Sequence, residues 1–167
     1  MNFETVLTYA VLLLFVILVA IVYNGIEEYN RKNETKMSFM ESMDLTGIPV
    51  VTFINNGKKF NFLLDTGANY SVINSSTLND IKYTSSSMTS KLFGMEGNAQ
   101  EVNFATINLE YKNNKFTDDF QVVDMGAAFD KVKQSSGVTV CGILGSEFFR
   151  KYKYILDFNN LIAYIKK

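Results

Sequence analysis

The sequence of 167 residues contains no histidine. This absence excludes serine and cysteine hydrolases that activate their nucleophile with an imidazole, together with most zinc hydrolases. The single cysteine, Cys141, allows no intrachain disulfide and no four-cysteine metal site. We interpret it as a small buried apolar side chain and not as a reactive thiol. No metal or other cofactor is predicted, so any hydrolytic chemistry has to run on carboxylates.

A strong charge of either sign is also missing. The chain has 16 basic and 17 acidic residues, a formal net charge of -1, and no long basic run. Nucleic acid binding normally needs a basic patch or stripe, so no nucleic acid partner is predicted. The length allows one compact domain with an appendage, but not two domains that each have a core.

The appendage is an uncharged apolar block at residues 5–23. A helix over this block would be about 28 Å long, close to the hydrocarbon thickness of a bilayer. A cleavable signal peptide and a buried core helix are the alternatives. Residues 1–4 carry no Lys or Arg, and no small-residue cleavage site follows the block, which argues against a signal peptide. We therefore expect a tail at 1–4 and a single transmembrane helix at 5–23 that lies in a lipid bilayer.

The residues after this block are polar. Residues 24–46 are interpreted as a juxtamembrane linker, and residues 47–167 as the folded domain. Arg31, Lys32 and Lys36 follow the apolar block closely. The positive-inside tendency then places the folded domain in the cytoplasm.

Short apolar runs broken by turn residues predict a mainly β domain from residue 48 onward. Residues 50–54 and 59–64 flank Asn55-Asn56-Gly57, a sequence that favours a tight hairpin. In the second of these strands Phe60, Phe62 and Leu64 share one face, and Leu63 faces the other way, so the strand end is expected to be buried on both sides.

Two more hairpins and two short helices complete the prediction. The hairpins pair residues 100–111 with 116–123 and residues 155–158 with 161–165. One helix is expected to begin at Ser146, whose side chain would cap it, and the other spans residues 76–81. Residues 85–87, three serines, are expected to form a loop.

A carboxylate follows the buried strand end directly, in the sequence Asp65-Thr66-Gly67-Ala68. Asp, Thr and Gly are all common in strand-ending turns, so a plain turn is one reading. The second reading is a site, because the acid lies at the mouth of the core beside a hydroxyl and a flexible glycine.

Two segments together resemble the retropepsin-like aspartic peptidases, of the membrane-anchored bacterial type. Residues 62–68 followed by 71–73 resemble the catalytic loop of that family, in which Asp65 is the catalytic residue. Gly142-Ile143-Leu144-Gly145 resembles the second motif, which packs beside that loop. The resemblance covers about residues 48–165 and implies a small closed β-barrel of the retropepsin type with one or two short helices.

The resemblance implies that peptide bonds are hydrolysed by two carboxyl groups that share one proton. This chain has one Asp-Thr-Gly, and its other aspartates lack that context, including Asp80, Asp124, Asp130 and Asp157. The second carboxylate is therefore expected from another copy, in a two-fold homodimer with Asp65 near its axis.

The resemblance also assigns supporting roles. Thr66 would bond across the dimer axis to the partner's backbone, and Gly67 and Ala68 would let the chains approach closely. The expected flap over a peptide substrate is Phe93, Gly94, Met95, Glu96, Gly97 and Asn98. An ordinary surface hairpin is the alternative interpretation of that segment.

Two other functions remain open at this point. One is a non-catalytic dimeric module of the same fold that binds extended peptides at the membrane. A pair of acids at a dimer axis argues against it, because a binding module has no need of that repulsion. The other is a membrane-bound structural protein in which Asp65 merely ends a strand.

Overall fold

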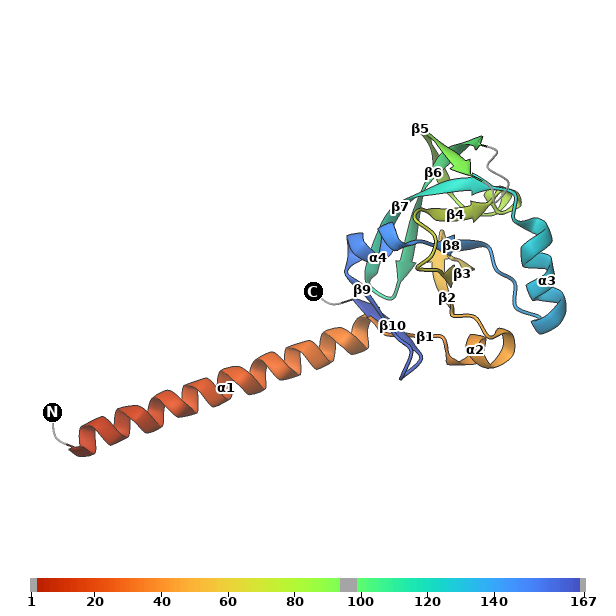
Figure 1. The fold of residues 1–167 in the computed structure, drawn as a ribbon. Coiled ribbons are helices and arrows are strands. Elements are labelled where there is room, and N and C mark those ends of the chain that lie inside the picture. Colours follow the sequence, from red (N-terminus) through yellow and green to blue (C-terminus); the bar gives the residue numbers. More distant parts are fainter. Residues whose placement is uncertain (1–2, 94–98, 166–167) are drawn as a thin grey trace. The chain divides into compact units, whose positions relative to one another are not determined.

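The structure is a computed structural model that describes residues 3–93 and 99–165 (Figure 1). It divides into two compact units, Met1–Glu34 and Thr35–Lys167. The first unit consists of helix α1, Phe3–Thr35, whose last residue belongs to the second unit. Within α1, Val6–Glu27 is long and apolar enough to cross a membrane, with a mean hydropathy of 2.9. A signal sequence can have the same length and apolar composition.

The segment expected to be a linker is structured. Helix α1 continues through its polar part as far as Thr35. Strand β1, Met37–Ser38, then pairs antiparallel with β10, Ile162–Ile165, near the other end of the chain. Helix α2, Met40–Thr46, follows. The compact unit therefore begins well before residue 47, because the side chains of Met37 and Phe39 are buried in its core.

The second unit is mainly β, as predicted, and contains a three-stranded and a seven-stranded sheet. The small sheet has the order β1-β10-β9, in which β9 is Tyr154–Asp157. The large sheet has the order β2-β3-β8-β4-β7-β6-β5. Its strands are β2 Val50–Asn55, β3 Lys58–Leu64, β4 Ser71–Asn74, β5 Tyr83–Phe93, β6 Ala99–Tyr111, β7 Asn114–Val123 and β8 Gly142–Leu144.

The large sheet curls until its first strand meets an inner strand. Strand β2 pairs with β6 through one residue pair, Ile54 and Glu110. The predicted closed barrel is therefore a curled sheet with one narrow contact between β2 and β6. The described residues also form the helical segments η1 Ser75–Asn79, α3 Gly126–Ser136 and α4 Ser146–Tyr152.

The hairpin of β2 and β3 forms as its sequence predicts. Asn56 and Gly57 both have positive φ, 48° and 79°, which is the geometry of the two-residue turn that joins twisted strands. Phe60, Phe62 and Leu64 are buried on one face of β3. The turn residues and the two-residue alternation thus fix the register that places Asp65 directly after β3.

Apolar side chains cover both faces of the sheet near this strand end. Phe62 and Leu64 belong to the main core with Phe148 of α4. Leu63 packs against a second cluster that includes Phe129 of α3. The strand end is thus apolar on both sides, as expected.

Three local features differ from the predictions. Residues 85–87 form no separate loop, because they lie within β5, which has a register shift between Ser85 and Thr89. Helix α3 was not expected. The predicted helix at 76–81 is the short 3-10 helix η1, Ser75–Asn79.

Candidate functional site

Two parallel strands end side by side at the candidate site. Strands β3 and β8 pair from Phe62 with Gly142 to Leu64 with Leu144. The chain of β3 continues into Asp65, whose backbone N–H donates to the Leu144 carbonyl at 3.1 Å. Buried apolar residues on both sides of this point fix where the acid emerges.

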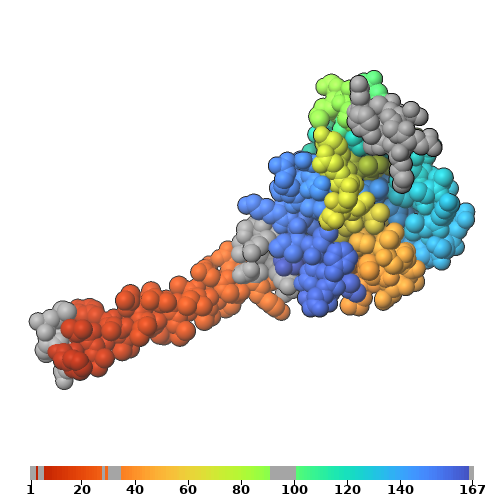
Figure 2. Space-filling model, viewed as in Figure 1, coloured from red at the N-terminus to blue at the C-terminus, as the bar shows by residue number. Residues whose placement is uncertain are grey.

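The residues after Asp65 form a tight turn, hereafter the acid loop, residues 65–70. The N–H of Gly67 donates to Asp65 Oδ1 at 2.8 Å, and the N–H of Ala68 donates to the Asp65 carbonyl at 3.3 Å. Asp65 is half-buried, whereas Thr66 and Gly67 are exposed. Figure 2 shows the yellow segment that follows β3 at the surface of the compact unit. The acid is therefore held in place and still reachable from solvent.

The two residues that follow the second motif, at the start of α4, form hydrogen bonds to the acid loop. The backbone N–H of Ser146 donates to the Ala68 carbonyl at 2.8 Å, and the N–H of Glu147 donates to the Asn69 carbonyl at 3.1 Å. Ser146 was expected to cap α4, but the cap position is taken by Gly145. The Ser146 hydroxyl instead donates to the Ala68 carbonyl at 3.0 Å. The start of α4 thus serves as a clamp on the loop.

Two glycines let the second motif approach this closely. A Cβ atom on Gly145 would lie 2.5 Å from the Tyr70 carbonyl oxygen, and one on Gly142 would lie 2.4 Å from the Val72 carbonyl oxygen. Both distances are shorter than any real contact of a Cβ atom, and backbone atoms cannot swing away. The contact between the two motifs therefore requires glycine at both positions.

A buried polar pair lies next to the acid loop. The Ser71 hydroxyl donates to Asp118 Oδ2 at 2.7 Å, and Lys151 Nζ lies 3.6 Å from Asp118 Oδ1. Burial raises the pKa of the Asp118 carboxyl above its ordinary value, although Ser71 and Lys151 oppose that shift. No pattern in the sequence indicates this pair, because Ser71 and Asp118 meet only in the folded sheet.

The segment expected to be the flap lies mostly outside the described residues. Phe93 is the last residue of β5 and pairs with Ala99 at the start of β6. Gly94, Met95, Glu96, Gly97 and Asn98 are not described.

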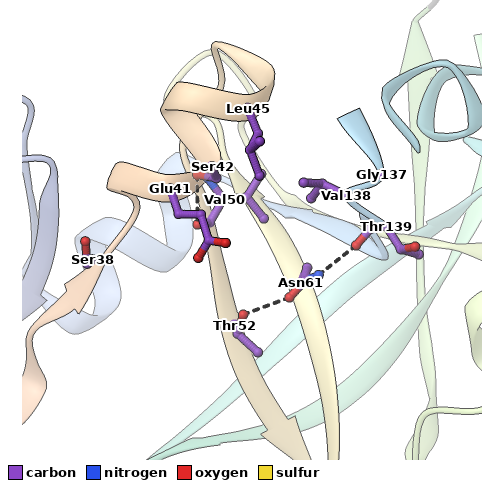
Figure 3. Close-up of a pocket in the computed structure, with 10 residues that line it drawn as sticks. All are labelled: Ser38, Glu41, Ser42, Leu45, Val50, Thr52, Asn61, Gly137, Val138 and Thr139. Atoms are coloured by element: carbon purple, nitrogen blue, oxygen red, sulfur yellow. Dashed lines mark hydrogen bonds between the residues drawn. The ribbon is translucent and has the colours of Figure 1, made fainter. Parts of the chain in front are cut away.

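A hollow of about 380 Å³ lies elsewhere on the unit (Figure 3). Asn61 bridges two of its walls, because its side chain bonds both the Thr52 hydroxyl at 2.8 Å and the Thr139 carbonyl at 2.9 Å. No acid-loop residue lines it. The lining residues are Ser38, Glu41, Ser42, Leu45, Val50, Thr52, Asn61, Gly137, Val138 and Thr139.

Within the part of the chain that the structure describes, no group of three His, Cys, Asp or Glu side chains is placed to hold a metal ion.

Comparison with protein families gives one match that covers both motifs. Residues 50–148 match the family model described as aspartyl protease. The chain belongs to the aspartyl protease family. The match begins with β2 and ends within α4, so it includes the acid loop and the clamp. The predicted resemblance to aspartic peptidases is thereby confirmed.

Solved structures similar to this aspartyl protease chain include the EIAV protease complexed with the inhibitor HBY-793. The two chains share 21% sequence identity, with a TM-score of 0.49, over 66% of this chain and 93% of that one. The comparison with curated proteins found no match.

Proposed function

We propose that this member of the aspartyl protease family is a membrane-anchored endopeptidase. It hydrolyses peptide bonds with a water molecule activated between two Asp65 carboxyl groups, one from each chain of a homodimer. The observation that carries the proposal is the position of Asp65, at the end of two paired strands in a loop clamped by Ser146 and Glu147. The acid is half-buried and its loop is exposed.

The chemistry needs one ionised and one protonated carboxyl group. The carboxylate takes a proton from water as the water oxygen attacks the carbonyl carbon, and the carboxylic acid gives its proton to the carbonyl oxygen. The carbon–nitrogen bond then breaks while a proton passes to the leaving nitrogen. Two carboxyl groups held close together retain one proton between them, because like charges repel.

A second copy of the chain would supply the partner acid. The sequence holds one Asp-Thr-Gly, and the second motif has Gly145 where the first has Asp65. Thr66 and Gly67 are exposed next to Asp65, so a second chain can contact a hydroxyl and a residue without a side chain there. A two-fold axis next to Asp65 brings identical loops together, with Thr66 bonding to the backbone of the partner subunit.

The substrate class is an extended peptide or protein segment. Strands β5 and β6 form a long antiparallel hairpin whose end at Phe93 leads into the segment proposed as a flap, residues 93–98. An extended peptide between such a flap and the acids would form strand-like backbone bonds, with side chains alternating between pockets.

Helix α1 would serve as the anchor, with the compact unit in the cytoplasm. Two copies confined to one membrane surface have a raised effective concentration, which favours a weak dimer without any new contact. The test is extraction of membranes with alkaline carbonate. The protein is expected to stay in the membrane pellet, and release into the supernatant would contradict the anchor.

The enzyme proposal is tested by Asp65→Asn in the full chain, assayed on a peptide library from pH 4 to pH 8. We expect cleavage to fall by at least about a thousandfold, because an amide cannot transfer the proton. Asp124→Asn is the matched control, since Asp124 Oδ1 accepts the N–H of Gly126 two residues on at 3.0 Å, as Asp65 does with Gly67. It should cleave like the wild type.

The outcomes separate the candidate functions. Equal cleavage by the wild type and Asp65→Asn would reject the pair of acids. Absence of cleavage by the wild type, with peptide still bound, would instead favour the non-catalytic peptide-binding module.

A further inference from the structure

The proposed reaction leaves one buried acid without a role. Asp118 of β7 has 9% of its surface exposed, and its partner Ser71, the first residue of β4, has 1% exposed. Strands β4 and β7 are parallel neighbours, with Ser71 opposite Phe120. The bond between the Ser71 hydroxyl and Asp118 Oδ2, at 2.7 Å, is thus shielded from water. Hydrogen bonds to an ionised partner in such surroundings are among the stronger ones.

The direction of the bonds around Ser71 is fixed by chemistry. Above the pKa of Asp118 its carboxylate is ionised and only accepts, so the Ser71 hydroxyl there donates its one proton to Asp118. The lone pairs of the hydroxyl oxygen then face the backbone N–H of Gly145, which donates to it at 3.3 Å. Asp118 therefore sets the orientation in which Ser71 holds Gly145.

Gly145 in turn determines where the acid loop lies. A Cβ atom on Gly145 would be 2.5 Å from the carbonyl oxygen of Tyr70 and 3.0 Å from that of Ala68, so the two backbones are in close contact. The residues on either side of Gly145 make the bonds to the loop. The Leu144 carbonyl accepts the N–H of Asp65, and the N–H of Ser146 donates to the Ala68 carbonyl. A small displacement of Gly145 is thus passed directly to the loop that carries Asp65.

We propose that Asp118 is a positioning residue for Asp65, acting through the Ser71 hydroxyl and the backbone of Gly145. The inference rests on the proposed function, because it assigns Asp118 a part in the geometry of the acid pair. Asp118 touches no substrate in this account. Its loss shifts Asp65 away from the geometry in which the two carboxyl groups share a proton, and displacements of this kind lower the rate of the chemical step.

The test compares substitutions in the full chain, in detergent micelles, using a cleaved peptide. Asp118→Leu removes the acceptor and keeps a similar volume, and kcat is expected to fall roughly ten- to a hundredfold while KM changes less than about twofold. Asp118→Asn keeps an acceptor oxygen for Ser71 and should recover most of kcat. Ser71→Ala should lower kcat as much as Asp118→Leu does. The double variant should have a kcat no lower than either single variant, because both substitutions break the same chain of contacts from Asp118 through Ser71 to Gly145.

Asp119→Leu is the matched control, one residue along the same strand. Asp119 bonds the Thr106 hydroxyl at 2.5 Å and has no bond to the acid loop in the structure. Its kcat should stay within about twofold of the wild type. An unchanged kcat in folded Asp118→Leu, or an equal fall in Asp119→Leu and Asp118→Leu, would overturn the proposal.

A second measurement works without any activity. The amide proton of Gly145 should exchange with solvent at least about tenfold faster in Ser71→Ala than in the wild type, since its acceptor is gone. Equal exchange rates of the Gly145 amide in Ser71→Ala and the wild type would overturn the proposed contact between Ser71 and Gly145. This holds even if Asp118→Leu fails to fold. If the wild type cleaves no peptide but the exchange difference is present, the proposed enzyme fails while the Ser71–Gly145 contact stands.

Discussion

The acid loop and the second motif begin alike and then diverge. Strands β3 and β8 run parallel in matched register, ending in Leu64 and Leu144. The first strand continues into Asp65, which is half-buried, and the second into Gly145, which is buried. The end of β3 presents a carboxylate. The end of β8 presents a glycine, which has no side chain, so the backbone of the acid loop packs directly against it. Chemistry and support are thus divided between two similar positions.

This division predicts different consequences for glycine substitutions in the two loops. Gly145→Ala should destabilise the fold by about 3 kcal/mol or more, because the new Cβ meets backbone atoms that cannot move aside. Gly67→Ala should cost much less stability, since its Cβ would meet only Asp65 Oδ1, at 3.1 Å. Activity should still fall in Gly67→Ala, because the acid has to shift. Thermal unfolding and peptide cleavage measure the two effects.

Gly126→Ala is the control for Gly145→Ala. A Cβ there would meet only the Asp124 side chain, at 3.2 Å, and Gly126 opens helix α3, where alanine is favoured. Its unfolding temperature should not fall. If Gly145→Ala were as stable as Gly126→Ala, the second motif would not be a close support for the acid loop.

The buried acid behind the loop gives a smaller, pH-dependent effect. The pKa of Asp118 is raised above 3.8 in the folded chain, mainly by burial, with Asp119 adding to the rise and Lys151 opposing it. Glu147 lines a small cavity together with Asp118, Asp119 and Lys151. The native state therefore holds this proton more tightly than the unfolded state does. Its stabilising contribution is present below pH 3.8 and is lost as the pH rises through the raised pKa.

Asp118→Asn isolates that contribution. As the pH rises from 3.8 through the raised pKa of Asp118, the wild type should lose stability relative to this variant. Denaturant unfolding at several pH values measures the difference. A constant difference, or a gain by the wild type, would mean that the fold does not favour the protonated acid.

The parts of the molecule that could be predicted depend on local signals. The Asn56-Gly57 turn and the alternation of Phe60, Phe62 and Leu64 determine a hairpin within a short stretch of chain. The acid loop and the second motif are likewise contiguous residues. Both can therefore be recognised from the sequence alone, and the family match covers them.

The remaining features depend on distant residues or weak patterns. Strand β1 exists because Met37 pairs with Ala163, at the far end of the chain. Helix α3 buries one side chain, Phe129, and only Val132 of the next turn packs partly against the same cluster, so few apolar residues mark this helix in the sequence. Strand β5 contains three consecutive serines and a register shift between Ser85 and Thr89, so its sequence lacks a regular strand pattern. The Ser71–Asp118 pair has no signature in sequence, because neither residue type is unusual at a strand.

The central claim is that one active centre needs Asp65 from two chains. The direct test mixes wild-type chains with an equal amount of Asp65→Asn chains, under conditions in which subunits exchange, and compares the cleavage rate with wild type at the same total concentration. Random pairing leaves about one quarter of the pairs with two acids, so about one quarter of the activity should remain. A remaining activity of about one half would contradict the account, because each chain would then be acting alone.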